Sequence, residues 1–236
     1  EIKISKDITI GIVDGSGVLY DPHGIDREEL LRLANARKMV INFDRSKLSK
    51  DGFFVSIDDK DVTLPNGEVV ESGLNFRNNF HLNPLARADL FVPCGGRPEA
   101  VNISNVHKLL RDGKPMFKYI IEGANLFFTQ EARAVLESAG VVLYKDASAN
   151  KGGVTSSSLE VLAALCLTPE EFDKHMCVKD GVVPEFYQAY VKDVKARIAE
   201  NARAEFECLW NEAEKTGMKR SVLTDVLSER INQLNT

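Results

Sequence analysis

Short apolar runs alternate with amphipathic segments from the start of the chain to about residue 167. The runs are rich in β-branched and aromatic residues, which is typical of strands. They predict strands at 8–14, 52–58, 88–94, 116–123 and 140–146. The segments between them have apolar residues at helical spacing, and they predict helices at 27–38, 97–111 and 129–139. Strands that alternate with helices indicate an α/β fold with a doubly wound, mainly parallel sheet covered on both faces.

Two short signals refine this pattern. Asp26 precedes the first predicted helix and Glu29 follows three residues later, an arrangement similar to a capping box. Within 61–72, a Pro-Asn-Gly sequence separates two short extended runs and predicts a hairpin.

From residue 154 onward the pattern is helical. Apolar positions predict helices at 154–166, 169–177, 184–215 and 221–234. Gly217 is suited to end the long third helix. A change of composition near 168–184 divides the chain into a sheet domain, residues 1–167, and a C-terminal helical segment, residues 168–236.

Composition narrows the class of protein. With 236 residues, 44% of them hydrophobic, the chain can bury a sizeable core, and its net charge of −5 gives no electrostatic reason to expect nucleic acid or an anionic membrane. No apolar stretch is long enough to span a bilayer, and no signal-peptide pattern is visible. The 4 cysteines form no CxxC pair, and the 4 histidines have no metal-ligand spacing. We therefore expect reduced thiols, no metal, and an intracellular location, cytoplasmic or mitochondrial.

Polar, glycine-rich stretches follow four of the predicted strands. They are Asp14–Gly17, Pro93–Gly96, Glu122–Asn125 and Asp146–Gly153. In open parallel sheets, ligands bind beyond the carboxyl ends of the strands. The last stretch enters a helix through three serines at 156–158, more than one cap requires. Free N–H groups and the positive dipole end favour a carboxylate there, so the turn is either an ordinary cap or an anion or substrate site.

Asp14, at the end of the first strand, has two interpretations. In a Rossmann-like fold an acidic residue there accepts hydrogen bonds from the adenine ribose and disfavours the 2′-phosphate of NADP. Alternatively, Asp14 and Gly15 simply begin a turn. The glycine-rich loop expected about 20 residues earlier is absent, since Gly11 is the only glycine before Asp14. Either the fold is a different one, or the chain is a fragment that lacks the first strand and the glycine-rich loop, with residues 1–7 as the tail of the first helix.

Asn125 and Cys94 also have alternative interpretations. Asn125 could bind the carboxamide of nicotinamide, or it could be a turn or cap residue. The glycines after Cys94 allow a ligand to approach the backbone closely, or they form a tight turn. No histidine lies near Cys94 in sequence, which disfavours a nucleophilic thiol.

In this order, the four strand ends resemble the nicotinamide-binding domain of the glutamate dehydrogenases. The similar segments are VDGSGVLYDPHGID, ADLFVPCGGRPEAVN, IEGANLFFTQEA and NKGGVTSSSLE. The segments KDGFFVSID, LNFRNNFHL and KDASANKGGVTSSSLEVL are similar to the large NAD-specific glutamate dehydrogenases of fungi and protists. The resemblance is strong up to about residue 165 and weaker beyond. Lys151 is a departure, because the smaller dehydrogenases have a small residue there.

The resemblance implies that residues 1–167 are an N-terminally truncated NAD-binding domain. It implies cofactor contacts for Asp14, Gly15, Ser16, Pro93, Cys94, Gly95, Asn125 and Asn150. It implies substrate contacts for Val154 and Ser157, with Ser157 on a substrate carboxylate. No catalytic residue is expected in this chain, because the family's catalytic lysine and aspartate belong to a separate substrate domain that nothing here matches.

The implied reaction is oxidative deamination of L-glutamate with NAD, which gives 2-oxoglutarate, ammonium and NADH. The implied partners are this small-molecule substrate and, in the full-length protein, further copies in a homo-oligomer; neither nucleic acid nor a membrane is expected. The chain alone is expected to be inactive and to bind NAD weakly or not at all. Two alternatives stay open: a sister dehydrogenase acting on leucine, phenylalanine or valine, and a non-catalytic binding or assembly module on the same sheet.

Overall fold

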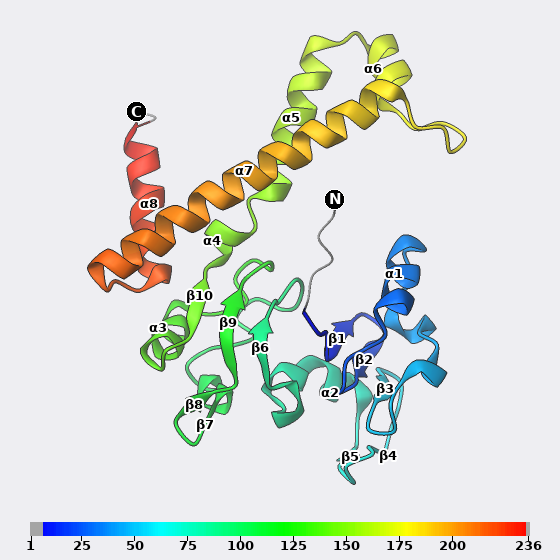
Figure 1. Cartoon of the computed structure of the whole chain (residues 1–236), viewed down its shortest axis with the longest axis vertical. Coiled ribbons are helices and arrows are strands. Elements are labelled where there is room, and N and C mark those ends of the chain that lie inside the picture. The colour runs from blue at the N-terminus through cyan, green and yellow to red at the C-terminus, as the bar shows by residue number, and fades with distance from the viewer. Residues whose placement is uncertain (1–6, 235–236) are drawn as a thin grey trace. The chain divides into compact units, whose positions relative to one another are not determined.

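The computed structural model describes residues 7–234 and forms two compact units (Figure 1). Within the described part, the first comprises residues 7–89 and Asn105–Lys118, and the second Leu90–Ser104 and residues 119–234. The helix tail predicted for residues 1–7 lies, up to residue 6, outside the described residues. The boundary predicted after residue 167 separates a cofactor-binding domain from a helical segment. It stays a prediction, because the division into compact units does not show which residues bind a cofactor. None of the helices in the described part combines the length and hydrophobicity that crossing a bilayer requires.

The first unit contains a sheet of three antiparallel strands in the order β1-β2-β3. They are β1 (Gly11–Asp14), β2 (Gly17–Tyr20) and β3 (Phe53–Ser56). The sequence predicted strands at 8–14 and 52–58 but neither β2 nor its antiparallel pairing. Asp14 pairs with Gly17, so Gly15 and Ser16 form a two-residue hairpin loop. A Cβ on Gly17 would lie 2.1 Å from the carbonyl oxygen of Val55, so only glycine fits there.

Smaller elements surround this sheet. The helices are α1 (Arg27–Asn35) and α2 (Gly73–Asn79), and the short 3-10 helices are η1 (Val40–Asn42), η2 (Arg45–Lys47), η3 (Phe80–Leu82), η4 (Pro84–Ala86) and η5 (Val106–Leu109). Two hairpins are β4 (Val62–Thr63) with β5 (Val69–Val70), and β7 (Leu110–Arg111) with β8 (Lys114–Pro115). The first of these confirms the hairpin predicted within 61–72. Side chains from both faces of the sheet are buried: Leu19 and Phe54 pack with α1, and Val18 and Tyr20 pack with Phe80.

The helix predicted at 97–111 is wrong. The short η5 and strand β7 form there, and Val101 bridges Phe128 in strand-like pairing. Glu99 has a φ of 56°, which a helix does not tolerate. The side chain of Asn102 accepts hydrogen bonds from the backbone N–H and the hydroxyl of Ser104, an Asx turn that competes with helical bonding.

Glu29 is buried on α1 and is used differently from the capping-box prediction. Asp26 accepts a hydrogen bond from the N–H of Glu29 at 2.7 Å, so half of that prediction is confirmed. The carboxylate of Glu29, however, accepts from Nε and Nη2 of Arg32, at 2.7 and 2.6 Å, and from the N–H of Asp44 at 3.0 Å. The hydrogen bonds from Arg32, and then that from Asp44, lower the pKa of Glu29 to about 2.

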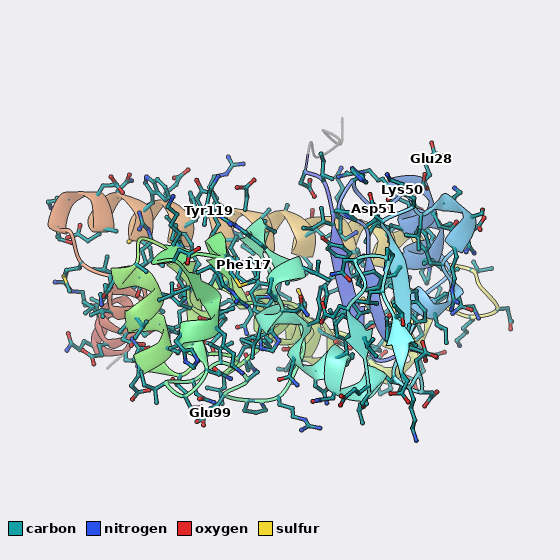
Figure 2. All side chains as sticks on the ribbon, turned by 90° about the horizontal axis from the view of Figure 1, so that it is seen from below. Glu28, Lys50, Asp51, Glu99, Phe117 and Tyr119 are labelled. Carbon is teal, nitrogen blue, oxygen red and sulfur yellow. The ribbon has the colours of Figure 1, made fainter. Side chains whose placement is uncertain are left out.

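The low pKa of Glu29 predicts a pH-dependent contribution to stability. A carboxyl group whose pKa falls from 4.5 to about 2 on folding stabilises the fold above pH 4.5, and this contribution is lost as the pH drops through 2. We expect Glu29→Gln to lower the Tm at neutral pH, with a deficit that shrinks as the medium is acidified through that interval. Thermal unfolding at a series of pH values measures it, with Glu28→Gln, an exposed neighbour (Figure 2), as the control. A deficit that stays constant in acid would contradict this role for Glu29.

The second unit is built on a sheet in the order β10-β9-β6. Its strands are β6 (Ala88–Phe91), β9 (Phe117–Ile121) and β10 (Val142–Tyr144), and β9 pairs with β10 in parallel. They confirm the three predicted strands, with shorter bounds. The helix predicted at 129–139 is α3 (Gln130–Ser138), with Thr129 as its cap. Tyr119 is exposed whereas Phe117, two residues earlier, is buried (Figure 2); Leu90 and Ile121 are exposed as well.

Five helices complete the second unit. They are α4 (Asp146–Ala149), α5 (Gly152–Cys166), α6 (Pro169–Met176), α7 (Glu185–Thr216) and α8 (Arg220–Leu234). All were predicted except the short α4. Thr168 and Glu171 form a reciprocal capping box at the start of α6. Tyr144, at the end of β10, is buried with Leu209 of α7 and Leu223 of α8, which anchors these helices to the sheet.

Gly217 ends α7 in the left-handed conformation, as predicted. Its φ is 71°, and its N–H donates to the carbonyl oxygen of Ala213. A Cβ there would meet no other atom within 4 Å, so a substitution costs only backbone strain. We expect Gly217→Ala to reduce the free energy of unfolding by about 1 kcal/mol, as measured by urea denaturation. Gly153→Ala, at a helical position with open space, is the control for adding a methyl group. Equal stability of the two variants would contradict the expectation.

Candidate functional site

Asp14 is held by its own hairpin loop in the first unit. Its Oδ1 accepts from the N–H of Ser16 at 2.8 Å and from the hydroxyl of Ser16 at 2.6 Å, and its Oδ2 accepts from the N–H of Val40 at 2.8 Å. A carboxylate offers about four acceptor positions, so one is left, on Oδ2. Asp14 is therefore a turn residue, and it keeps one acceptor for a ligand hydroxyl. The two interpretations drawn from the sequence are compatible.

Ser16 and Gly15 differ in accessibility. Ser16 is buried, and its hydroxyl also accepts from the N–H of Ile41 at 3.2 Å. Its side chain therefore stabilises the loop through hydrogen bonds with Asp14 and Ile41. Gly15 is exposed. Contacts from this pair to a ligand would come from the backbone. The other predicted site residues belong to the second unit, and they are described there.

The loops after β6 and β9 lie side by side in the second unit. Pro93 is buried, and its carbonyl oxygen accepts from the N–H of Ala124 at 2.7 Å. A Cβ on Gly123 would lie 3.2 Å from Sγ of Cys94, so glycine permits this close approach. Cys94 and Gly95 are exposed and form the open side of the pair of loops.

Asn125 and Asn150, which are 25 residues apart, are brought together. Nδ2 of Asn150 donates to Oδ1 of Asn125 and lies 3.4 Å from the carbonyl oxygen of Gly123. The loop after β9 is thereby tied to the turn between α4 and α5. Asn125 is exposed, and this bond uses its amide oxygen. Its NH2 group is a double donor that a carboxamide oxygen could accept from.

The serines at the start of α5 do not cap it, so the ordinary-cap interpretation of this turn is wrong. The helix begins at Gly152, and no side chain accepts from its first N–H groups at the N-cap, Lys151. Ser156 donates to the carbonyl oxygen of Gly153 at 2.9 Å, and Ser157 donates to that of Val154 at 3.1 Å. These are bonds back into the helix, which a serine can exchange for a bond to a ligand. Ser157 is exposed, and 70% of the surface of Val154 is accessible.

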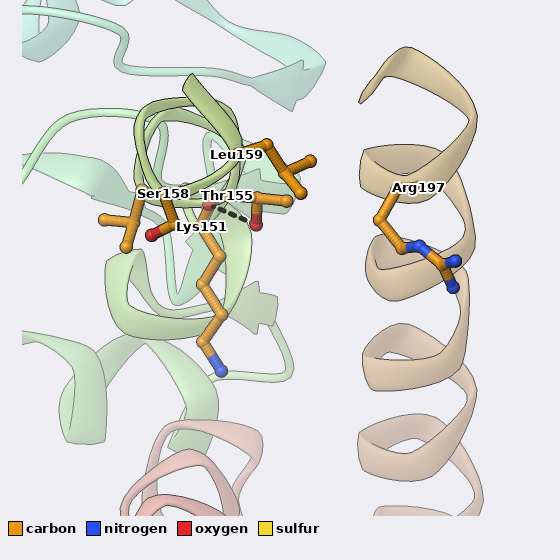
Figure 3. A pocket seen from close by; sticks show the side chains of 6 residues that line it. Lys151, Thr155, Ser158, Leu159 and Arg197 are labelled. Atoms are coloured by element: carbon orange, nitrogen blue, oxygen red, sulfur yellow. Dashed lines mark hydrogen bonds between the residues drawn. The ribbon is translucent and has the colours of Figure 1, made fainter. Parts of the chain in front are cut away.

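A hollow of ≈ 630 Å³ lies between the start of α5 and α7 (Figure 3). It is lined by Lys151, Val154, Thr155, Ser158, Leu159 and Arg197. Nζ of Lys151 is 2.7 Å from both carboxylate oxygens of Glu205 on α7. The lysine noted as a departure from the smaller dehydrogenases therefore ties the start of α5 to α7.

The sequence analysis missed a buried ionic network beneath these loops. Nε and Nη2 of Arg133 donate to the two oxygens of Glu122, each at 2.7 Å, and Nη2 lies 3.4 Å from Oδ1 of Asp146. The exposed fractions of the residues are 3% for Arg133, 0% for Glu122 and 6% for Asp146. Burial raises the pKa of Glu122, and the guanidinium of Arg133 offsets part of that rise.

A signal for this network was present in the sequence. Arg133 lies among the residues that α3 buries, beside Ala132 and three positions before Leu136. Glu122 directly follows the apolar strand β9. A charge on an otherwise apolar helix face predicts a buried partner of opposite sign. Among the described residues, no group of three or more His, Cys, Asp or Glu could hold a metal ion.

Comparison with known protein families decides where the chain belongs. A family model described as Glutamate/Leucine/Phenylalanine/Valine dehydrogenase matches residues 2–217. The chain belongs to this family. The match includes every strand of the structure and helices α1 to α7. The resemblance proposed from the four strand ends is thereby confirmed at the level of the family.

Curated relatives in this dehydrogenase family are much longer than the chain. Glutamate dehydrogenase 2 of Dictyostelium discoideum is 65% identical over 236 residues, which are 100% of the chain and 23% of that protein. The NAD-specific glutamate dehydrogenase of Neurospora crassa is 59% identical over the same 236 residues, 22% of its length. The chain thus spans less than a quarter of the length of each of these two relatives.

Solved structures support the dehydrogenase fold. A glutamate dehydrogenase from Plasmodium falciparum has a TM-score of 0.53 with 18% identity, over 96% of the chain and 41% of that structure. A hetero-hexameric glutamate dehydrogenase from Thermus thermophilus has a TM-score of 0.52 with 17% identity, over 95% of the chain and 40% of that structure. At these identities the likeness shows the fold, which is the α/β, Rossmann-like arrangement expected from the sequence.

Proposed function

We propose that the chain is the cofactor-binding part of an NAD-dependent glutamate dehydrogenase. The reaction is L-glutamate with NAD and water to 2-oxoglutarate, ammonium and NADH. The observation that carries the proposal is the pairing of Asn125 with Asn150 beside the uncapped start of α5. It puts amide donors next to free helix N–H groups, which suits a carboxamide and a carboxylate at one site. Identities of 65% and 59% to proteins named as glutamate dehydrogenases support the choice of substrate.

The residues of this chain have binding and orienting roles in the proposal. Asp14 accepts one ribose hydroxyl with the free position on Oδ2, and the backbone of Gly15 and Ser16 lies beside it. Pro93, Cys94 and Gly95 line the cofactor cleft, and Asn125 with Asn150 orients the nicotinamide carboxamide. When bound, NAD supplies the hydride acceptor. Val154 and Ser157 hold the amino acid, with the hydroxyl of Ser157 on a substrate carboxylate.

The catalytic lysine and aspartate are proposed to lie in a separate substrate domain of a longer protein. A chain that spans 23% of its relative supports this division. We also propose a homo-oligomer; the hetero-hexameric enzyme of the same fold supports assembly into an oligomer, though of unlike chains. An intracellular compartment, cytoplasm or mitochondrion, is proposed because Cys94, Cys166, Cys177 and Cys208 are all free thiols.

The decisive experiment measures NAD reduction by the full-length protein with L-glutamate, L-leucine, L-phenylalanine and L-valine in turn. We expect the highest kcat/KM with glutamate. Preference for one of the other amino acids would identify a sister dehydrogenase, and no activity with any of them would favour a non-catalytic module. Ser157→Ala is expected to raise the KM for glutamate and to leave the KM for NAD unchanged. Ser156→Ala, which removes a neighbouring hydroxyl bonded within the helix, is the matched control.

A further inference from the structure

The buried network of Arg133, Glu122 and Asp146 connects the two loops that carry Asn125 and Asn150. Glu122 begins the loop after β9, and Asp146 is the first residue of α4, after β10. Arg133 contacts both carboxylates from α3. A single guanidinium therefore joins the carboxyl ends of two neighbouring parallel strands.

Asp146 extends this connection to the backbone of the first loop. Its Oδ2 accepts from the N–H of Leu126 at 2.7 Å, and its Oδ1 accepts from the N–H of Ala147 at 2.8 Å. Leu126 has a φ of 57°, a left-handed conformation that a leucine rarely adopts. Strained backbone persists only where surrounding groups hold it. The hydrogen bond that the N–H of Leu126 donates to Asp146 therefore fixes the residue that follows Asn125.

Stability alone gives little reason for such a network. Well-packed apolar side chains of similar volume stabilise an interior as well as a buried ion pair does, or better. Apolar contacts do not fix the orientation of the groups that they join. The bidentate, charge-assisted hydrogen bonds of this network do fix the orientation of each group. The two carboxylates held in this way, Glu122 and Asp146, lie in the same loops as Asn125 and Asn150.

We propose that Arg133 is a positioning residue of the cofactor site, which holds the loops of Asn125 and Asn150 in the geometry that binds nicotinamide. The inference rests on the proposed function. Arg133 is buried and reaches the two loops through Glu122 and Asp146. Its loss changes how the cofactor is held, while the substrate contacts on α5 stay as they are.

The test separates positioning from stability in the full-length protein. Arg133→Met with Glu122→Met removes both charges of the main pair and keeps the volume apolar. Asp146 keeps its hydrogen bonds from the N–H groups of Leu126 and Ala147, so this double variant is expected to melt closer to the wild type than Arg133→Met alone. Its KM for NAD is expected to rise on the order of 10-fold with an unchanged KM for glutamate. Arg133→Lys keeps one charge–charge contact, so its KM for NAD is expected to lie between those of the wild type and the double variant. If the single variant Arg133→Met does not fold, these two variants still decide the question.

Arg220→Met is the matched control. Arg220 is another largely buried arginine of the same unit, packed on Trp210 and paired with Glu214, and none of these residues lies in either loop. It is expected to lower the Tm and leave the KM for NAD unchanged.

The possible failures are distinguishable. An active wild type whose double variant has a normal KM for NAD would overturn the positioning role alone. A wild type that does not reduce NAD with glutamate would overturn the proposed function and, with it, the cofactor role of Arg133.

Discussion

Arg133→Met is expected to destabilise the chain by roughly 3–5 kcal/mol, the cost of leaving a buried charge without its partner. Glu122 has no exposed surface, and both of its carboxylate oxygens depend on Arg133. Asp146 loses its nearest cation as well. Urea denaturation at neutral pH gives the free energy of unfolding, with Arg220→Met as the comparison. That variant loses a contact with Trp210 and a pair with exposed Glu214, for which we expect about 1 kcal/mol.

The loss in Arg133→Met should depend on pH. Burial already raises the pKa of Glu122 above its ordinary value of 4.5, and removing the guanidinium raises the pKa further. A carboxyl group with a raised folded pKa favours the fold while it is protonated, and stability is lost as the pH rises through the interval between the unfolded and folded pKa. The variant is therefore expected to be closer to the wild type in mild acid than at alkaline pH. A loss that is equal at all pH values would show that lost packing, rather than the unpaired charge of Glu122, is the cause.

Asp14→Asn is expected to weaken NAD binding by the full-length enzyme by on the order of 10- to 100-fold, the worth of one hydrogen bond to a charged acceptor. Three of the acceptor positions of Asp14 are used by Ser16 and Val40. An amide oxygen has two lone pairs, so asparagine cannot accept the same three bonds and one from a ribose hydroxyl as well. Loss of the negative charge also removes the repulsion of a 2′-phosphate, so the preference for NAD over NADP should fall. The ratio of kcat/KM for the two cofactors measures this.

Ser16→Ala is the matched control for Asp14→Asn. It removes the hydroxyl that braces the loop through Asp14 and the N–H of Ile41, and it keeps the carboxylate. We expect a lower Tm with an unchanged cofactor preference. If Ser16→Ala shifts the preference as much as Asp14→Asn, loop geometry rather than the charge of Asp14 sets it.

The sequence was sufficient to predict those elements whose conformation is decided by neighbouring residues. The cap of α1 at Asp26, the hairpin within 61–72 and the end of α7 at Gly217 depend on residues a few positions apart. The apolar runs predicted β3, β6, β9 and β10 because runs rich in β-branched and aromatic residues favour extended backbone. The strand-end polar residues could also be found in this way, since a buried strand must end where polar groups meet solvent.

Sequence reasoning failed where residues far apart compete for the same backbone. Val101 pairs with Phe128, and this pairing together with the turn at Asn102 prevailed over the helical spacing of 97–111. The antiparallel pairing of β2 with β3 depends on Gly17 fitting against Val55, which no local pattern shows.

The sequence by itself determined the family, most of the elements and the positions at which ligand-binding residues follow strands, because these are carried by local pattern and motif. Only the tertiary structure decided that Asn150 binds Asn125, that Asp14 has one acceptor position left, and that Arg133 joins Glu122 and Asp146. Each of these depends on a hydrogen bond whose direction and partner are set by how the chain packs. The spacing of residues along the chain determines neither the direction nor the partner of such a hydrogen bond.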